Sequence, residues 1–137
     1  MKVTLSAMIA ATAVLALVVA GGPVLAHHAF SAQFDSAQPI SIKGAITKME
    51  WTNPHSWLYV DVKEPDGKVV AWEIELGAPN NLFRAGWSKR DLPVGAEVTI
   101  TGFRSKDGRP SANGNDIVLP NGKKLFSGMP ATEAPAK

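Results

Sequence analysis

The chain has 137 residues, no cysteine and a formal net charge of +2 at neutral pH. The absence of cysteine excludes disulfides, thiolate ligation of iron–sulfur clusters and thiol nucleophiles. Lysine and arginine are scattered among acidic residues, whereas a nucleic-acid face would need them clustered. We therefore expect no nucleic-acid partner.

The first 26 residues are predicted to be an export signal. Lys2 is the only charge before an apolar run from Leu5 to Ala20, and this run is shorter than the roughly 20 residues that span a bilayer. Val24 and Ala26 occupy the two positions that a signal peptidase reads, so cleavage is expected after Ala26. The mature protein would then be periplasmic or secreted. An uncleaved membrane anchor and a cut after Ala20 are the alternatives.

The remaining chain is long enough for one compact domain. We divide it into a lead-in (27–38), a folded body (39–126) and a tail (127–137) that is expected to be mobile. The lead-in carries Phe30 and Phe34 in an otherwise polar, small-residue stretch. Because exposed aromatic side chains are unfavourable in water, both are expected to pin the lead-in to the body.

Apolar alternation predicts three consecutive strands, at 39–51, 57–62 and 69–76. The inward face of the first strand changes phase near Thr47, which predicts a bulge. Asp66-Gly67 predicts a tight hairpin between the second and third strands. Glu73 and Glu75 alternate with apolar residues in the third strand, so both are expected on its solvated face.

The second half of the body begins with a predicted short helix within 78–86, ended by glycine. A turn, a strand at 96–104 with a bend at Gly102, and a strand around 117–119 follow, with a last apolar pair at 125–126. Turns are expected at Asn113-Gly114 and Asn121-Gly122. The order predicts a mainly β chain, a five- to six-stranded Greek-key barrel of the oligonucleotide/oligosaccharide-binding (OB) type with one short helix between strands 3 and 4. A small open β-sandwich is the alternative.

The three histidines are the candidate metal ligands. Cleavage after Ala26 would give His27 a free amine beside its imidazole, which together form a bidentate chelate. His55, in the turn between the first two strands, would supply an opposing nitrogen, and His28 a fourth ligand or a neighbour. Nitrogen-rich sites favour Cu(II), so the expected cofactor is a copper ion, and Asp35 is a candidate acceptor that orients an imidazole. The alternative is a solvated terminus and a turn histidine bonded to backbone.

A second candidate surface is aromatic. Trp51 and Trp57 flank the predicted turn and are expected on a partly exposed rim, with Asn53 between them, whereas Trp72 is expected in the core. This rim would bind a small ligand, a saccharide or a periplasmic protein without a metal. No catalytic motif occurs, so the chain is not expected to be an enzyme, and a copper oxygenase with a histidine brace is the least favoured interpretation.

Several short segments resemble one family of exported bacterial proteins, known as domain of unknown function 6152. They are Ala26-His27-His28-Ala29-Phe30, Phe34-Asp35, Lys43-Gly44-Ala45-Ile46, Trp51-Thr52-Asn53-Pro54-His55, Glu75-Leu76-Gly77-Ala78-Pro79-Asn80, Arg84-Ala85-Gly86-Trp87 and Gly95-Ala96-Glu97-Val98-Thr99-Ile100-Thr101-Gly102. The resemblance implies that the His-His pair at the mature start and the Asn-Pro-His turn belong together, which points to His27, His28 and His55. It carries over no catalytic residue, because none is established for the family.

Overall fold

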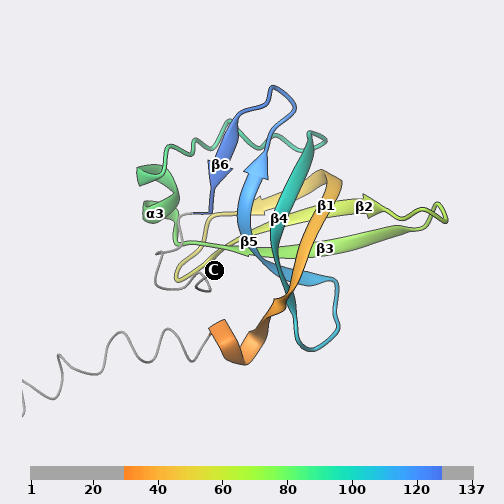
Figure 1. Cartoon of the computed structure of the whole chain (residues 1–137). Helices are drawn as coiled ribbons and strands as arrows, with labels where there is room; N and C mark the ends of the chain where they lie inside the picture. The colour runs from red at the N-terminus through yellow and green to blue at the C-terminus, as the bar shows by residue number, and fades with distance from the viewer. Residues whose placement is uncertain (1–29, 128–137) are drawn as a thin grey trace, which may run out of the picture.

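The computed structural model describes residues 30–127 (Figure 1). The predicted export signal, the cleavage point, His27, His28 and the tail after Ser127 lie outside these residues, and they stay predictions. Within residues 30–127, no helix is both long enough and apolar enough to cross a membrane.

The described chain is mainly β, as predicted, with one short helix between the third and fourth strands. A helical turn at residues 30–33 leads directly into the first strand. That strand begins at Phe34, five residues earlier than predicted. The elements are β1 (Phe34–Glu50), β2 (Ser56–Lys63), β3 (Val69–Leu76), α3 (Pro79–Arg84), β4 (Glu97–Ser105), β5 (Ser111–Val118) and β6 (Lys124–Phe126).

Five of the six strands close into a ring through their hydrogen bonds. The sheet order is β3-β2-β1-β4-β5-β6, and β3 also pairs with β5. The β3–β5 pairing is parallel, with Ile74 opposite Ala112, whereas the other pairings are antiparallel. Each of the five strands of the ring therefore has a neighbouring strand on both of its edges. Strand β6 extends the sheet beyond β5 (Figure 1).

The long strand β1 pairs with two neighbouring strands because it bends. It pairs with β4 through its first part and with β2 through its second, and the β1–β2 register shifts between Ile46 and Lys48. This shift confirms the bulge that the change of phase predicted near Thr47. The bulge increases the local bend of the strand, which lets β1 curve around the ring.

Two of the three predicted Asx-Gly turns are confirmed. Gly67 and Gly122 have φ of 87° and 81°. The third prediction is wrong: Asn113-Gly114 is not a turn but the middle of β5. A side chain at 114 would come within 2.8 Å of Ile74 and Leu76 side-chain atoms. Glycine at this position therefore lets the core side chains of β3 pack against the backbone of β5.

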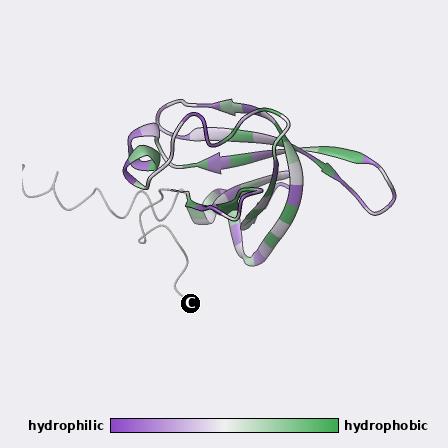
Figure 2. Ribbon diagram, turned by 90° about the horizontal axis from the view of Figure 1, so that it is seen from above, coloured by the Kyte–Doolittle hydropathy of each residue, from purple (hydrophilic) through white to green (hydrophobic). Residues whose placement is uncertain are grey.

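The core fills the inside of the ring. Figure 2 shows hydrophilic and hydrophobic residues alternating along the strands, as expected when one face is buried and the other meets water. Trp72 is only 5% exposed, which confirms its predicted place in the core. The fully buried large apolar side chains are Ile46, Leu58, Val60, Ile74, Leu76, Leu82, Val98, Ile100 and Ile117, together with Leu125 of β6.

Candidate functional site

His55 is paired with a buried carboxylate. It lies in the β1–β2 connection, where the Thr52 hydroxyl donates a hydrogen bond to the backbone oxygen of His55 at 2.8 Å. The imidazole Nδ1 contacts Oε1 of Glu75, and the side chain of His55 is 44% exposed whereas that of Glu75 is 6% exposed. The β2–β3 register explains the contact, because Trp57 lies opposite Glu75 and thus places the start of β2 beside the end of β3.

The burial of Glu75 corrects the expectation that both glutamates of β3 are solvated. Glu73 is exposed, but Glu75 is 5% exposed. Both glutamates have strand neighbours on both edges. Glu75 differs because it also contacts His55 and lines a cavity walled by the lead-in and the β4–β5 loop, so that segments outside β3 cover it. Alternation along one strand cannot detect this covering of its outer face.

Asp35, the carboxylate that was expected to orient an imidazole, has local partners instead. Its two carboxylate oxygens accept hydrogen bonds from the backbone N–H of Ala37 and the side-chain amide of Gln38, both at 2.9 Å. The Ala37 bond, and then the Gln38 bond, lower the pKa of Asp35 below its usual range. The carboxylate in contact with the imidazole of His55 is that of Glu75.

The pairing fixes which nitrogen of His55 is available to a ligand. A carboxylate only accepts hydrogen bonds, so Nδ1 carries the proton that lies between the two groups. In the neutral imidazole the lone pair is then on Nε2, at the other edge of a ring that is nearly half exposed. An imidazole held in this way by a carboxylate is the usual arrangement of a histidine that ligates a metal through its second nitrogen.

A cavity of about 390 Å³ adjoins Glu75. Its walls come from four parts of the chain that are far apart in the sequence: the lead-in (32–34), Trp57 on β2, Glu75 on β3, and the β4–β5 loop with the strand ends beside it. The loop contributes two cations, Lys106 and Arg109, and one carboxylate, Asp107. The cavity therefore combines charged groups of both signs with an aromatic wall.

The lead-in is fixed beside this cavity by its two phenylalanines. The ring of Phe30 lies 5.7 Å from that of Phe34 and 6.0 Å from that of Phe103 on β4. Phe34 is 5% exposed. The prediction that Phe30 and Phe34 pin the lead-in to the body is confirmed, and the described chain thus begins close to the cavity wall.

The two rim tryptophans are half-buried, as expected, but they have different surroundings. Trp51 stacks on Phe83 of α3 with ring centroids 5.0 Å apart and meets Trp87 edge-on at 6.3 Å. Trp57 lines the cavity instead. Asn53 is exposed in the turn between them. Of the three residues proposed for an aromatic rim, Trp57 is the one that lines the cavity.

The described residues alone do not assemble a metal site. Within residues 30–127, no three histidine, cysteine, aspartate or glutamate side chains form a group that could hold a metal ion. His55 is the histidine within this range, and the other two proposed ligands, His27 and His28, lie before it.

A family model described as a family of unknown function, DUF6152, matches residues 14–114. The match covers about three quarters of the chain, so the chain belongs to this family, as the resemblance predicted. No curated protein matches the chain, and no solved structure matches it.

Proposed function

We propose that this member of the DUF6152 family is an exported protein that binds one copper ion between its mature N-terminus and His55. The observation that carries the proposal is the contact between His55 Nδ1 and the buried Glu75. A buried carboxylate behind a surface imidazole directs Nε2 outward and raises its basicity as a ligand. The role would be binding, buffering or delivery of copper in the periplasm.

The ligand set follows from the chemistry of the three histidines. After cleavage at Ala26, the α-amine of His27, with a pKa of about 8 before binding, would lose its proton to the metal. The amine and Nδ1 of His27 and Nε2 of His55 would give three nitrogens, and His28 would be a fourth ligand or a neighbour. Such a set favours Cu(II) over the other divalent first-row metals.

The position of the lead-in supports this set. Phe30 is anchored on Phe34 and Phe103, and the next residues of the lead-in line the cavity that Glu75 also lines. Three residues of extended chain reach about 10 Å. A chain that starts at His27 would therefore keep its terminal ligand within about 10 Å of the anchored Phe30.

For the fold, we propose the OB-like barrel rather than an open sandwich. The pairing of β1 with both β2 and β4, and the parallel pairing of β3 with β5 that closes the ring, support it. The short helix between β3 and β4 supports it as well. In this arrangement His55 occupies a connection at one end of the barrel.

The proposal is tested with protein that begins at His27. Cu(II) is titrated in competition with a chelator of known affinity, and one equivalent is expected to bind tightly. His55→Ala is expected to weaken binding at least about tenfold, because the opposing nitrogen is lost. Equal affinity of His55→Ala and the parent would contradict the proposal.

A second arm tests the terminal chelate. One glycine added before His27 moves the free amine away from the imidazole, and weaker binding is expected. The intact mass of the exported protein fixes its first residue, and a start at Gly21 would remove the proposed chelate. A start at His27 is the result that the proposal requires.

The second candidate function, a metal-free binding module, is favoured by the cavity beside Trp57. It would place a small ligand, a saccharide or a protein segment against Trp57, the residue of the proposed aromatic rim that lines the cavity. Under this alternative, ligand binding would shift the fluorescence of the protein and would be lost in Trp57→Ala, while His55→Ala would leave it unchanged.

A further inference from the structure

Four aromatic residues form a cluster beside α3 and β6. Trp51 stacks on Phe83 and meets Trp87 edge-on, and the indole N–H of Trp87 donates a hydrogen bond to the carbonyl oxygen of Phe126. Trp87 is 4% exposed, whereas Phe83 and Phe126 are 40% and 43% exposed. This aromatic cluster (Trp51, Phe83, Trp87 and Phe126) therefore presents two phenylalanines to water on top of packed tryptophans.

The chain around the aromatic cluster is rich in cations. Residues 79–94 and 120–127 contain one carboxylate, Asp91, and five cations, which are Arg84, Lys89, Arg90, Lys123 and Lys124. Lys123 pairs with Asp91, and Lys124 pairs with Asp116 of β5. The side chains of Arg84, Lys89 and Arg90 are exposed and form no ion pair within residues 30–127. Three cations beside the exposed phenylalanines are thus available to an anionic partner.

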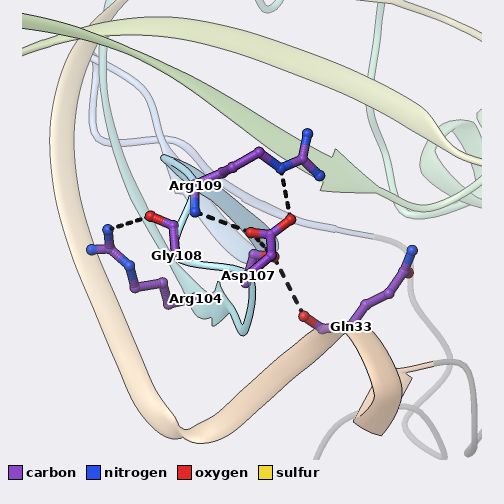
Figure 3. Close-up of polar contacts among 6 residues, drawn as sticks. Gln33, Arg104, Asp107, Gly108 and Arg109 are labelled. Carbon is purple, nitrogen blue, oxygen red and sulfur yellow. Dashed lines mark hydrogen bonds and ion pairs between the residues drawn. The ribbon is translucent and has the colours of Figure 1, made fainter.

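The rest of the described chain has the opposite charge balance. It holds seven cations and ten carboxylates. Two of these cations have partners in the β4–β5 loop, where Arg109 Nε donates to Asp107 at 2.6 Å and Arg104 Nη2 lies 3.5 Å from the carbonyl oxygen of Gly108 (Figure 3). Positive charge is therefore in excess near α3 and β6. Such an asymmetry turns the aromatic cluster toward an anionic surface.

An anionic bilayer fits this combination better than a protein or a nucleic acid. Amphipathic segments that lie on membranes combine Lys and Arg with Trp, Phe and Leu. A protein partner would need about 800 Å² of surface on this side, whereas the aromatic cluster exposes less than half of each of two phenylalanines. Single-stranded nucleic acid stacks on aromatic faces, but one face of Phe83 is already covered by Trp51.

We propose that the aromatic cluster and its three cations, Arg84, Lys89 and Arg90, form a docking surface for a bilayer that contains anionic phospholipids. The exposed parts of Phe83 and Phe126 would lie at the level of the headgroups, and the cations would contact lipid phosphates. The protein would then be held at a membrane surface without spanning it. This inference goes beyond copper binding and uses none of the proposed metal ligands.

Co-sedimentation of metal-free protein with vesicles tests the proposal. Protein that begins at His27 keeps every described residue and lacks the apolar run 5–20, which would itself favour a bilayer. Vesicles of equal parts phosphatidylglycerol and phosphatidylcholine are expected to bind it at least about tenfold more tightly than vesicles of phosphatidylcholine alone. Equal binding to both kinds of vesicle, or binding to neither, would overturn the proposal.

Two double variants with the same change of net charge locate the cations. Lys89→Gln with Arg90→Gln is expected to weaken binding to the anionic vesicles roughly fivefold for each cation removed. Lys63→Gln with Lys68→Gln is the matched control, because both lysines are exposed at the β2–β3 hairpin, on the side of the molecule away from α3 (Figure 1).

The control should change the affinity at most about twofold at about 0.15 M salt, where charges more than about 8 Å apart are screened. Equal losses of affinity in the two double variants would overturn the proposed surface. These variants alter exposed side chains only, so they decide the outcome even if an aromatic variant does not fold.

Phe126→Ser tests the apolar part of the surface. It is expected to weaken binding to the anionic vesicles about tenfold, because apolar contact with the lipid is lost. Val69→Ser, at an exposed apolar position of the β2–β3 hairpin, should bind like the parent. Unchanged affinity of a folded Phe126→Ser would overturn the proposal, as would tighter binding of the parent to a poly-glutamate peptide or to oligothymidine than to the anionic vesicles.

Discussion

Glu75 is the residue that turns His55 from a turn histidine into a candidate ligand. The sequence indicated the position of His55 in a connection between strands, and the structure places it there. Its carboxylate partner could not be predicted, because Glu75 reads as one of two equivalent polar positions on β3. Both have strand neighbours on both edges, and the buried Glu75 differs from the exposed Glu73 by its contact with His55 and by the cavity it shares with the lead-in and the β4–β5 loop.

The two glutamates provide a matched pair of variants. Glu75→Gln is expected to weaken Cu(II) binding about 10- to 100-fold, since the loss of a carboxylate that orients a ligating histidine has effects of this size. Glu73→Gln, on the same strand but exposed to solvent, should bind Cu(II) like the parent. Competition titrations of both variants measure the difference, and equal affinities would contradict the role given to Glu75.

Asp107 is expected to make the stability of the fold sensitive to acid. The Arg109 side chain, its backbone N–H and the Ser105 hydroxyl lower the pKa of Asp107 from 3.8 to about 2. A carboxyl whose pKa is lower in the folded state stabilises the fold above its unfolded pKa, and this contribution is lost as pH falls through the folded pKa. The contribution should therefore be complete above about pH 5 and be lost as the pH falls through about 2.

Urea unfolding of the parent and of Asp107→Ala at several pH values measures this contribution. The difference in unfolding free energy is expected to be constant above about pH 5, to shrink between pH 4 and 2, and to be small throughout because Asp107 is exposed. A difference that stays the same down to pH 2 would show that the carboxylate charge plays no part in it.

At the scale of the elements, period-2 alternation and turn residues located most strands. The predicted 69–76 strand coincides with β3, and the bulge in β1 was visible as a change of phase. Asn113-Gly114 was misread because the same dipeptide suits a tight hairpin and a strand that another strand approaches closely. The distance to Ile74 and Leu76, which decides between them, is a tertiary property.

Gly102 lies where the backbones of β4 and β5 approach each other closely. The register of the two strands shifts at Thr101/Gly102, and a Cβ at 102 would lie 2.1 Å from the carbonyl oxygen of Asn113. Gly102→Ala is expected to destabilise the protein by about 3 kcal/mol, because backbone atoms must move apart. Ser41→Ala, at an exposed position of β1, should lie within about 0.5 kcal/mol of the parent.

Thermal and urea unfolding of the two variants measure these free energies. If Gly102→Ala is as stable as Ser41→Ala, the two strands can separate at this point without cost. The tight β4–β5 contact would then not be a requirement of the ring.

At the scale of the whole molecule, the ring brings together segments that the sequence keeps far apart. The lead-in, the β1–β2 connection, the end of β3 and the β4–β5 loop meet around Glu75 and the cavity. Composition and strand order were sufficient to predict a mainly β domain with a helix after the third strand. The hydrogen bonds that Lys106 and Ser105 donate to the carbonyl oxygens of Ser31 and Gln33 were not predicted, because hydrogen bonds to backbone carbonyls leave no pattern in the sequence.

The central claim is that one metal ion joins the mature N-terminus to His55. Electron paramagnetic resonance of the protein that begins at His27, loaded with one equivalent of Cu(II), tests it most directly. We expect a tetragonal spectrum with nitrogen couplings from at least three nitrogens, and the loss of one of them in His55→Ala. An identical spectrum for the parent and His55→Ala, or the spectrum of aqueous Cu(II), would contradict the claim.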